Sequence, residues 1–355
     1  MDTNKFNQIL NIAFEKRVSD VHFEVDNPPF FRARGQLVRS KLEPLKPEDT
    51  EFIVKTILEQ NDRELTNDLL ETDAAYALPN GGRFRVSIFR QRRSLGIIMR
   101  VIPPQVGGFK DLNLPDVLGD IARAPNGLVL VTGPTGNGKS TTLASTLEYL
   151  NQSFNYNIIT IEDPIEFIFE SKKSCIIQRE VGVDTEGFHP ALKAALRMDP
   201  DVIMVGEMRD LETIDASIKA AETGHLVFAT LHTQSAVSTV NRLVGHFPPD
   251  AQELIRKRLA DILVATISLR LIRDKTGEHL VPVVEIMRNT TTIQACINEG
   301  RLGDIVEHIE KGSSEYGMQS LDQHLVELVE QDRITVEGAK AISRSTDLER
   351  KLMFT

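Results

Sequence analysis

The sequence of 355 residues lacks several features that would assign it to a well-defined class of protein. No apolar run approaches the roughly 18 residues that a membrane-spanning helix needs. The two cysteines, Cys175 and Cys296, lie far apart and outside any C-x-x-C pair, so neither a zinc ribbon nor a disulfide framework is predicted. The first residues contain no basic segment followed by an apolar one, and we therefore expect no signal peptide.

Positive charge is also scarce. Lysine and arginine number 41 against 51 aspartates and glutamates, which gives a formal net charge of -10 and a pI near 5.4. Proteins that work mainly through a nucleic-acid groove usually carry a basic excess, so we expect no nucleic-acid partner, although a local basic patch remains open. These properties together predict a cytoplasmic protein in a reducing environment.

The length suits two domains, and the first 102 residues have the pattern of a small α+β domain. Apolar residues recur at helical spacing over 4–17, alternate over 21–25 and return to helical spacing over 48–60. Residues 81–102 predict two strands joined by a polar turn at 91–94. The candidate buried positions on these strands are Val86, Ile88, Ile97 and Met99.

A stretch with proline and glycine at 103–115 predicts an interdomain linker or hinge. Beyond it, over 116–355, short apolar segments at 128–133, 158–162, 201–207 and 226–232 alternate with helical segments. This alternation predicts an α/β domain with a mostly parallel sheet covered on both faces. After about residue 285 the pattern is helical.

The segment GPTGNGKS at 133–140 satisfies the phosphate-loop pattern G-x-x-x-x-G-K-[ST], after an apolar strand and before a helix. Glycines let the backbone amides converge on phosphates, the lysine reaches the β and γ oxygens, and the Ser140 hydroxyl can ligate Mg²⁺. Asparagine at 137 replaces a small residue and should not disturb the backbone amides. The residues predicted to bind ATP are Gly133, Pro134, Thr135, Gly136, Asn137, Gly138, Lys139, Ser140 and Thr141.

Hydrolysis needs a carboxylate that orients water beside the γ-phosphate. Glu207 follows an apolar strand, where the carboxyl ends of parallel strands meet a nucleotide crevice, and it is the predicted catalytic carboxylate. The alternative for Glu207 is a structural ion pair with Arg209. Glu162 and Asp163 follow another strand and are predicted to position water and magnesium, with a polar turn before Pro164 as their alternative; Glu162 and Glu207 would reach Mg²⁺ through water.

Histidines and arginines supply further candidates. His232 ends a predicted strand on the same edge as Glu207 and could sense the γ-phosphate. The alternative is a hydrogen-bonded structural residue, which a lone histidine more often is, and His225 is assigned no other role. Arginines are concentrated in the hairpin of the first domain. A neighbouring subunit's triphosphate would be a natural partner for them, and a charged edge strand is the alternative. The arginines in question are Arg83, Arg85, Arg90, Arg92, Arg93 and Arg100.

The ordered motifs resemble the type IV pilus retraction ATPases, the PilT/PilU branch of the secretion ATPase superfamily, over nearly the whole chain. The matching segments are SDVHFEVDNPPFFRARG, GRFRVSIF, GPTGNGKSTT, ITIEDPIEF, IQREVGVDTEGF, DPDVIMVGEMRDLETI and AETGHLVFATLHT. The resemblance implies a PAS-like amino-terminal domain and a RecA-like ATPase domain with a helical carboxyl-terminal region. It also implies a hexameric ring with nucleotide between subunits, and a pilus retraction motor.

By the same resemblance, Glu207 is the catalytic carboxylate, Glu162 belongs to the acidic box and His232 to the histidine box. Arg83, Arg85 and Arg100 are then candidate trans arginines. The ring would dock from the cytoplasm on a PilC-like inner-membrane platform protein and turn it by domain rotation. The tetracysteine zinc module and extra amino-terminal domain of assembly motors are absent from this sequence, which favours retraction.

One segment departs from the family pattern. Retraction motors usually carry A-I-R-N-L-I-R-E after the P-V-V-E-I strand, whereas this chain reads TIQACINE at 292–299. An accessory PilU-like ATPase that modulates a paralogous motor is therefore an alternative hypothesis, as is a nucleotide-gated scaffold with little turnover. A DNA-pumping relative is disfavoured by the acidic charge balance.

Overall fold

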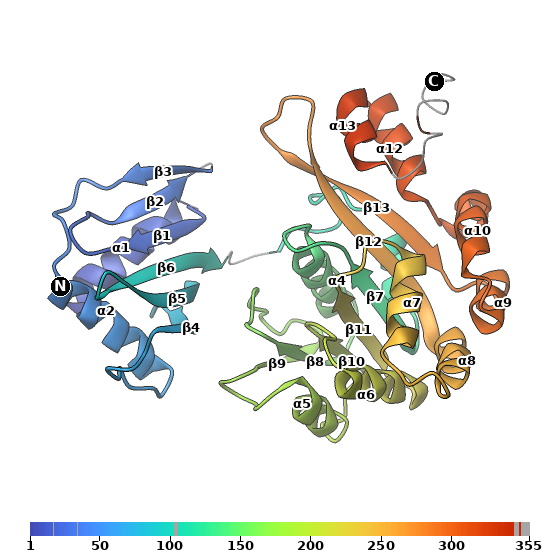
Figure 1. Cartoon of the computed structure of the whole chain (residues 1–355), viewed down its shortest axis with the longest axis horizontal. Helices are drawn as coiled ribbons and strands as arrows, with labels where there is room; N and C mark the ends of the chain where they lie inside the picture. Colours follow the sequence, from blue (N-terminus) through green and yellow to red (C-terminus); the bar gives the residue numbers. More distant parts are fainter. Residues whose placement is uncertain (17, 34, 103–105, 344–347, 349–355) are drawn as a thin grey trace. The chain divides into compact units, whose positions relative to one another are not determined.

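The structure is a computed structural model that describes residues 1–16, 18–33, 35–102, 106–343 and 348 (Figure 1). Its contacts divide the chain into two units: Met1–Val106 with Pro164–Ile168, and Gly107–Asp163 with Phe169–Thr355. The predicted linker at 103–115 spans this division, and residues 103–105 of it lie outside the described part. Leu114 is buried in the second unit. That residues 103–115 act as a hinge stays a prediction.

The first unit contains a six-stranded sheet with the order β3-β2-β1-β6-β5-β4, in which every neighbouring pair is antiparallel. Two helices cover one face of this sheet (Figure 1). The predicted helix at 4–17 and the predicted helix at 48–60 are both present, with Arg17 outside the described residues. The elements are α1 (Thr3–Glu15), β1 (Asp20–Phe23), β2 (Phe30–Ala33), β3 (Gln36–Arg39), α2 (Pro47–Gln60), β4 (Glu71–Ala77), β5 (Arg83–Gln91) and β6 (Ser94–Ile102).

The hairpin of β5 and β6 confirms the alternation seen in the sequence. The four positions predicted to be buried have no exposed surface, and they pack against α1 and α2 in one hydrophobic core. The intervening positions point to the opposite face, because successive side chains of a strand alternate. Arg92 and Arg93 form the two-residue turn with φ of 47° and 69°, as a tight hairpin turn requires.

The second unit contains a seven-stranded sheet with the order β13-β12-β7-β11-β10-β8-β9. All neighbouring pairs are parallel except β12 with β13. The four predicted strands are present, whereas β9 and β12 were not predicted. The strands are β7 (Gly127–Thr132), β8 (Asn157–Glu162), β9 (Cys175–Glu180), β10 (Val202–Val205), β11 (Leu226–Leu231), β12 (Leu263–Arg273) and β13 (Leu280–Arg288).

Helices cover both faces of this sheet, which explains why β7, β10 and β11 are buried at every residue. The first two helices, α3 and α4, pack on one face, and α5 to α10 supply the core of the other (Figure 1). Among the described residues, no helix combines the length and apolar character needed to cross a membrane. The helices are α3 (Val117–Ala122), α4 (Lys139–Ser153), α5 (Phe188–Ala195), α6 (Leu211–Glu222), α7 (Ala236–Gly245), α8 (Gln252–Ile262), α9 (Thr291–Glu299) and α10 (Ile305–Lys311).

The carboxyl-terminal region is helical as predicted, but only after β13 ends at Arg288. A short 3₁₀ turn, η1 (Leu302–Asp304), and α11 (Ser313–Tyr316) precede α12 (Leu321–Glu330) and α13 (Val336–Ile342). These last two helices pack against the far ends of β12 and β13 in a separate small core. The long β12–β13 hairpin therefore joins the main sheet to the terminal helices.

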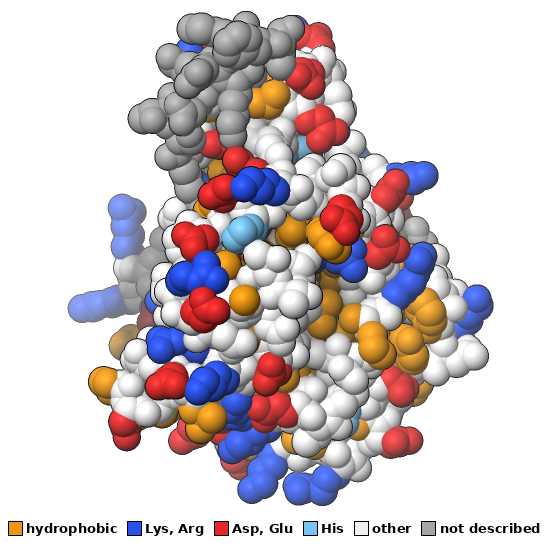
Figure 2. Space-filling model, turned by 90° about the vertical axis from the view of Figure 1, so that its right-hand side faces the viewer, with side chains coloured by type: hydrophobic (Ala, Val, Ile, Leu, Met, Phe, Trp, Pro, Cys, Tyr) orange, Lys and Arg blue, Asp and Glu red, His pale blue; other side chains and the backbone are white. Residues whose placement is uncertain are grey.

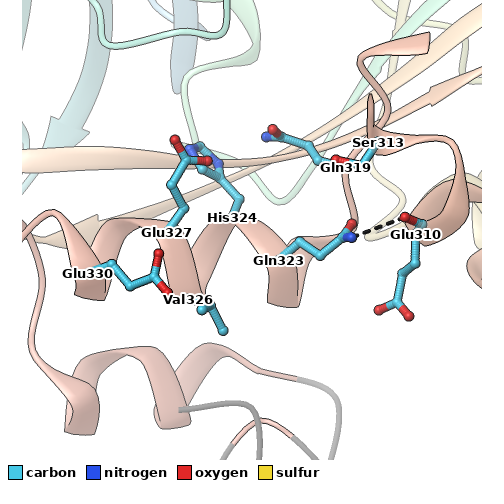
Figure 3. A pocket seen from close by; sticks show the side chains of 8 residues that line it. All are labelled: Glu310, Ser313, Gln319, Gln323, His324, Val326, Glu327 and Glu330. Carbon is cyan, nitrogen blue, oxygen red and sulfur yellow. Dashed lines mark hydrogen bonds between the residues drawn. The ribbon is translucent and has the colours of Figure 1, made fainter. Parts of the chain in front are cut away.

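His324 caps the outer edge of β13, next to the backbone bridge between Ile286 and Gln319. Its Nδ1 accepts a hydrogen bond of 2.9 Å from the Val284 N–H, and Gln319 Nε2 donates to the Val284 carbonyl at 2.7 Å. Burial, with a smaller contribution from Arg333, lowers the pKa of His324 to about 4, so that the ring stays neutral and its lone pair can accept the bond. The ring also lines a cavity of about 490 Å³, beside which Gln323 donates to the Glu310 carbonyl (Figure 3).

This cap predicts a pH-dependent stability. Because the pKa of His324 is about 4 when folded and about 6.5 when unfolded, the unfolded chain binds more protons between these values. The free energy of unfolding should therefore fall as the pH drops from about 6.5 to 4, with about 3 kcal/mol arising from this residue. Urea unfolding at several pH values measures the slope. His324→Asn, whose amide oxygen can accept from Val284, should flatten it, and an unchanged slope would contradict the assignment.

Candidate nucleotide-binding site

The predicted phosphate loop connects the central strand β7 to the start of α4, and three of its glycines have positive φ: Gly133, Gly136 and Gly138. Gly133, with φ of 145°, has no room for a side chain, because a Cβ atom there would lie 2.4 Å from the Leu269 carbonyl oxygen of β12. Gly138, with φ of 83°, is the N-cap of α4. The loop therefore follows the side of β12 and ends at a helix amino terminus, where backbone N–H groups favour an anion.

Lys139 is folded back onto this loop. Its side-chain ammonium donates to the carbonyl oxygens of Gly133 at 2.8 Å and Pro134 at 3.1 Å, and it lies 3.4 Å from Nδ1 of His232. The residue is only 8% exposed. A buried cation needs such acceptors, since an unpaired ammonium would be costly to remove from water.

A chain of polar contacts runs from Lys139 through His232 to Glu207. Nε2 of His232 lies 2.9 Å from Oε1 of Glu207, and Nδ1 also contacts the Thr135 hydroxyl at 3.4 Å. An ammonium can only donate, so Nδ1 accepts from Lys139 and the ring proton on Nε2 is directed at the carboxylate. The structure thus brings together the loop lysine and the two residues predicted to follow β10 and β11.

The other carboxylate oxygen of Glu207 pairs with Arg209. Arg209 Nη2 lies 2.8 Å from Oε2 of Glu207, and Nη1 lies 3.8 Å from Asp163. The ion pair considered as the structural alternative is therefore present, together with the histidine contact. With its side chain 17% exposed, Glu207 is accessible while its orientation is set from two sides.

Glu162 ends the neighbouring strand β8 and is 7% exposed. Its Oε1 accepts hydrogen bonds from the Thr160 hydroxyl at 2.6 Å and from Gln178 Nε2 at 3.1 Å. Gln178 lies on β9, which was not predicted. Glu162 therefore lies at the predicted edge of the sheet, and Gln178 of β9 holds its carboxylate.

Two further contacts come from β12 and were not predicted. The amide oxygen of Asn137 accepts a 2.8 Å hydrogen bond from the Leu271 N–H, and Arg270 Nη2 donates to Gln234 Oε1 at 2.7 Å. Adjacent residues of β12 thus hold the phosphate loop and the segment that follows His232. No local sequence pattern shows this, because it depends on β12 lying beside β7 in the sheet.

The candidate arginines of the first unit lie in its own sheet. Arg85 and Arg100 are paired across β5 and β6, and Arg83 is two residues from Arg85 on the same face. Arg100 Nε lies 3.0 Å from Asp20, which is itself buried, and Arg85 lies 3.8 Å from Asp73. Carboxylates of the same sheet therefore hold two of the three side chains on the face opposite the helices.

Comparison with known proteins places this arrangement in a family. The family model described as type II/IV secretion system protein matches residues 3–347. The chain belongs to the type II/IV secretion system protein family. The motif order noted in the sequence is therefore that of a family of secretion ATPases, and the resemblance is confirmed.

Within the type II/IV secretion family, relatives of similar length match nearly the whole chain. The type IV pilus retraction ATPase PilT of Pseudomonas aeruginosa is 44% identical, covering 94% of this chain and 96% of the relative. The twitching motility protein of Neisseria gonorrhoeae is 42% identical, covering 90% and 85%. The type IV pilus ATPase PilU of Pseudomonas aeruginosa is 36% identical, covering 97% and 90%.

Two solved structures agree with the fold. A crystal structure of the pilus retraction motor PilT with bound ADP matches with a TM-score of 0.88 at 41% identity, covering 97% of this chain and 98% of that one. The ATPase DotB of Legionella pneumophila matches with a TM-score of 0.78 at 26% identity, covering 96% of each chain. The predicted fold, an amino-terminal domain followed by a RecA-like domain, is thereby confirmed.

The glycines of the phosphate loop give a matched test of its geometry. Gly133→Ala would combine positive φ with a clash against β12, and we expect it to destabilise the second unit by about 1–3 kcal/mol and to abolish nucleotide binding. Gly136→Ala, with φ of 77° and no atom within 4 Å of the added Cβ, should cost about 1 kcal/mol and weaken nucleotide binding less than Gly133→Ala does. Thermal unfolding and fluorescent-nucleotide titration measure both, and equal effects would contradict the close approach to β12.

Proposed function

We propose that this protein is an ATP-hydrolysing motor that powers retraction of type IV pili. The observation that carries the proposal is the contact chain from Lys139 through His232 to Glu207, which joins a phosphate loop to a carboxylate at the carboxyl ends of neighbouring parallel strands. Such an edge is where open α/β sheets bind nucleotides. The PilT and twitching motility relatives support the retraction role.

In this proposal, the loop amides and the Lys139 ammonium bind the triphosphate, and the lysine exchanges its backbone carbonyl partners for phosphate oxygens. The Glu207 carboxylate orients the attacking water and accepts its proton. His232 holds Glu207 and contacts Lys139, so it is placed to couple occupancy of the phosphate site to the orientation of the carboxylate. Glu162 orders water near the same edge of the sheet.

A magnesium ion fits the residues present. No group of three or more His, Cys, Asp or Glu in the described part of the chain could hold a metal by itself, and Mg²⁺ commonly takes most of its ligands from phosphates and water. The Ser140 hydroxyl in the first turn of α4 would supply the direct protein ligand, with Glu162 and Glu207 acting through water. The ion would neutralise charge on the transferred phosphoryl group.

In this proposal, the arginines of the first unit act only on nucleotide that is bound to a neighbouring subunit. We infer that the chain forms a hexameric ring, in which Arg83, Arg85 and Arg100 face the triphosphate of a neighbouring subunit and stabilise its developing charge. Arg100 is anchored on the buried Asp20, which would hold its guanidinium in a fixed orientation. The ring would act at the cytoplasmic side of the inner membrane, on a PilC-like platform protein.

The catalytic assignment is tested by Glu207→Gln. The amide cannot accept the proton of the attacking water, so we expect ATP turnover to fall by about 100-fold or more while nucleotide affinity is retained. Glu253→Gln on α8, at an exposed residue paired with Lys257, is the matched control and should keep full turnover. Phosphate release and nucleotide titration measure the two effects, and sustained turnover in Glu207→Gln would remove this residue from the mechanism.

The biological role is tested by deleting the gene in its host and complementing with the wild type or Glu207→Gln. A retraction motor predicts abundant surface pili without twitching, rescued only by the wild-type protein. Pili are counted by electron microscopy and movement is scored on agar. Deletion cells without surface pili would instead show that the motor extends pili.

An accessory ATPase is the second candidate function, and α9 favours it. Where retraction motors usually have two arginines, α9 carries Gln294 and Asn298, and Gln294 donates a 3.1 Å hydrogen bond to Asp261 of α8. The surface of α9 therefore lacks two positive charges that the usual retraction motor would present to a partner. The PilU relative supports this reading. Unchanged motility in the deletion strain, together with ATP turnover in the purified protein, would favour it.

A further inference from the structure

A hydrogen bond between β12 and the side chain of Asn137 tethers the phosphate loop, and the loop motif does not require this contact. The pattern G-x-x-x-x-G-K-[ST] leaves position 137 open, yet the side chain found there reaches the neighbouring strand. Asn137 Oδ1 accepts a 2.8 Å hydrogen bond from the Leu271 N–H. The amide nitrogen of the same side chain lies 3.2 Å from the Thr135 carbonyl and 3.4 Å from the Pro134 carbonyl.

The register of the sheet explains why this contact is needed. The parallel ladder between β7 and β12 ends with Thr132 opposite Ser268, where β7 gives way to the loop. Leu271 pairs with Pro282 of β13 two positions beyond the Leu269–Val284 pair, in which the Val284 N–H points away from β12 to His324. Pairs two positions apart in an antiparallel ladder have the same hydrogen-bonding pattern, so the Leu271 N–H points away from β13. The Leu271 N–H therefore points past the end of β7, and the side-chain carbonyl of Asn137 takes the place of a missing backbone acceptor.

The tether acts on the carbonyls that hold the loop lysine. Pro134 O accepts from both Asn137 and Lys139, and Gly133, whose carbonyl also accepts from Lys139, is pressed against Leu269 of β12. Asn137 thus fixes the middle of the loop to the strand that already confines its beginning. The side chain is half-buried and is held at both its oxygen and its nitrogen.

We propose that Asn137 is a positioning residue that preorganises the phosphate loop for nucleotide by fixing it to β12. The inference rests on the proposed ATP binding and goes beyond it by assigning a role to a side chain that the loop motif leaves free. Its function is to keep the loop amides converged, so that binding a triphosphate does not have to order them. Because Asn137 does not touch the reacting atoms, its effect belongs to affinity rather than to the chemical step.

The experiment compares the wild-type protein with Asn137→Ala, Asn137→Ser and Asn155→Ala. Asn155 is exposed, lies between α4 and β8, and controls for loss of an asparagine outside the loop. Losing one hydrogen bond of ordinary net strength predicts that the KM for ATP and the Kd of a fluorescent ATP analogue rise about 3–10-fold in both Asn137 variants. The kcat should change less than KM, and the Asn155 variant should match the wild type.

The outcomes separate this proposal from the proposed function. A wild-type protein that binds no nucleotide would overturn both. A wild type that binds and hydrolyses ATP, with unchanged KM and Kd in Asn137→Ala and Asn137→Ser, would overturn the tether alone. A fall in kcat without a rise in KM would also overturn it, because preorganisation of the loop acts on binding. The serine variant keeps a small polar side chain and so guards against misfolding of the alanine variant.

Discussion

The Lys139 ammonium carries a positive charge into a position where only 8% of the residue is exposed. Its carbonyl acceptors belong to the loop itself, and it also contacts His232 at the end of another strand. Removing a cation from water is tolerated only when the surrounding acceptors are held in place. The shape of the loop and the position of His232 are therefore linked through one charged group.

The parallel sheet supplies the rigidity that this charge needs. The central strand β7 lies between β11 and β12, so the loop after β7 has a fixed neighbour on each side. The strand on one side delivers His232, and Glu207 follows the next strand beyond it. On the other side, β12 confines Gly133 and receives Asn137. Residues separated by more than 130 positions in sequence thus meet around one loop.

Charged side chains are arranged in two different ways, one on the face shown in Figure 2 and another on the sheet of the first unit. On the face shown in Figure 2, acidic and basic side chains are interspersed rather than segregated. In the sheet of the first unit, by contrast, strand alternation places Arg85, Arg100 and Arg32 in one row with Asp20. The buried carboxylate of Asp20 lies within 3.0 Å of Arg100 and 3.7 Å of Arg32. One buried carboxylate thus holds two arginine side chains on the same face of this sheet.

By itself, the sequence determined the local features: the two helices of the first unit, the helix after the phosphate loop, the helical carboxyl-terminal region, the four apolar parallel strands, the phosphate loop, and the positions of Glu207 and His232 at strand ends. Each of these depends on periodicity or on a short motif, and such signals are contained within a few neighbouring residues. Only the tertiary structure decided that β12 lies beside β7, that Gln178 of β9 holds Glu162, and that Asn137 reaches Leu271. Strand order and register bring together residues that are distant in sequence, and no local pattern encodes which strands become neighbours.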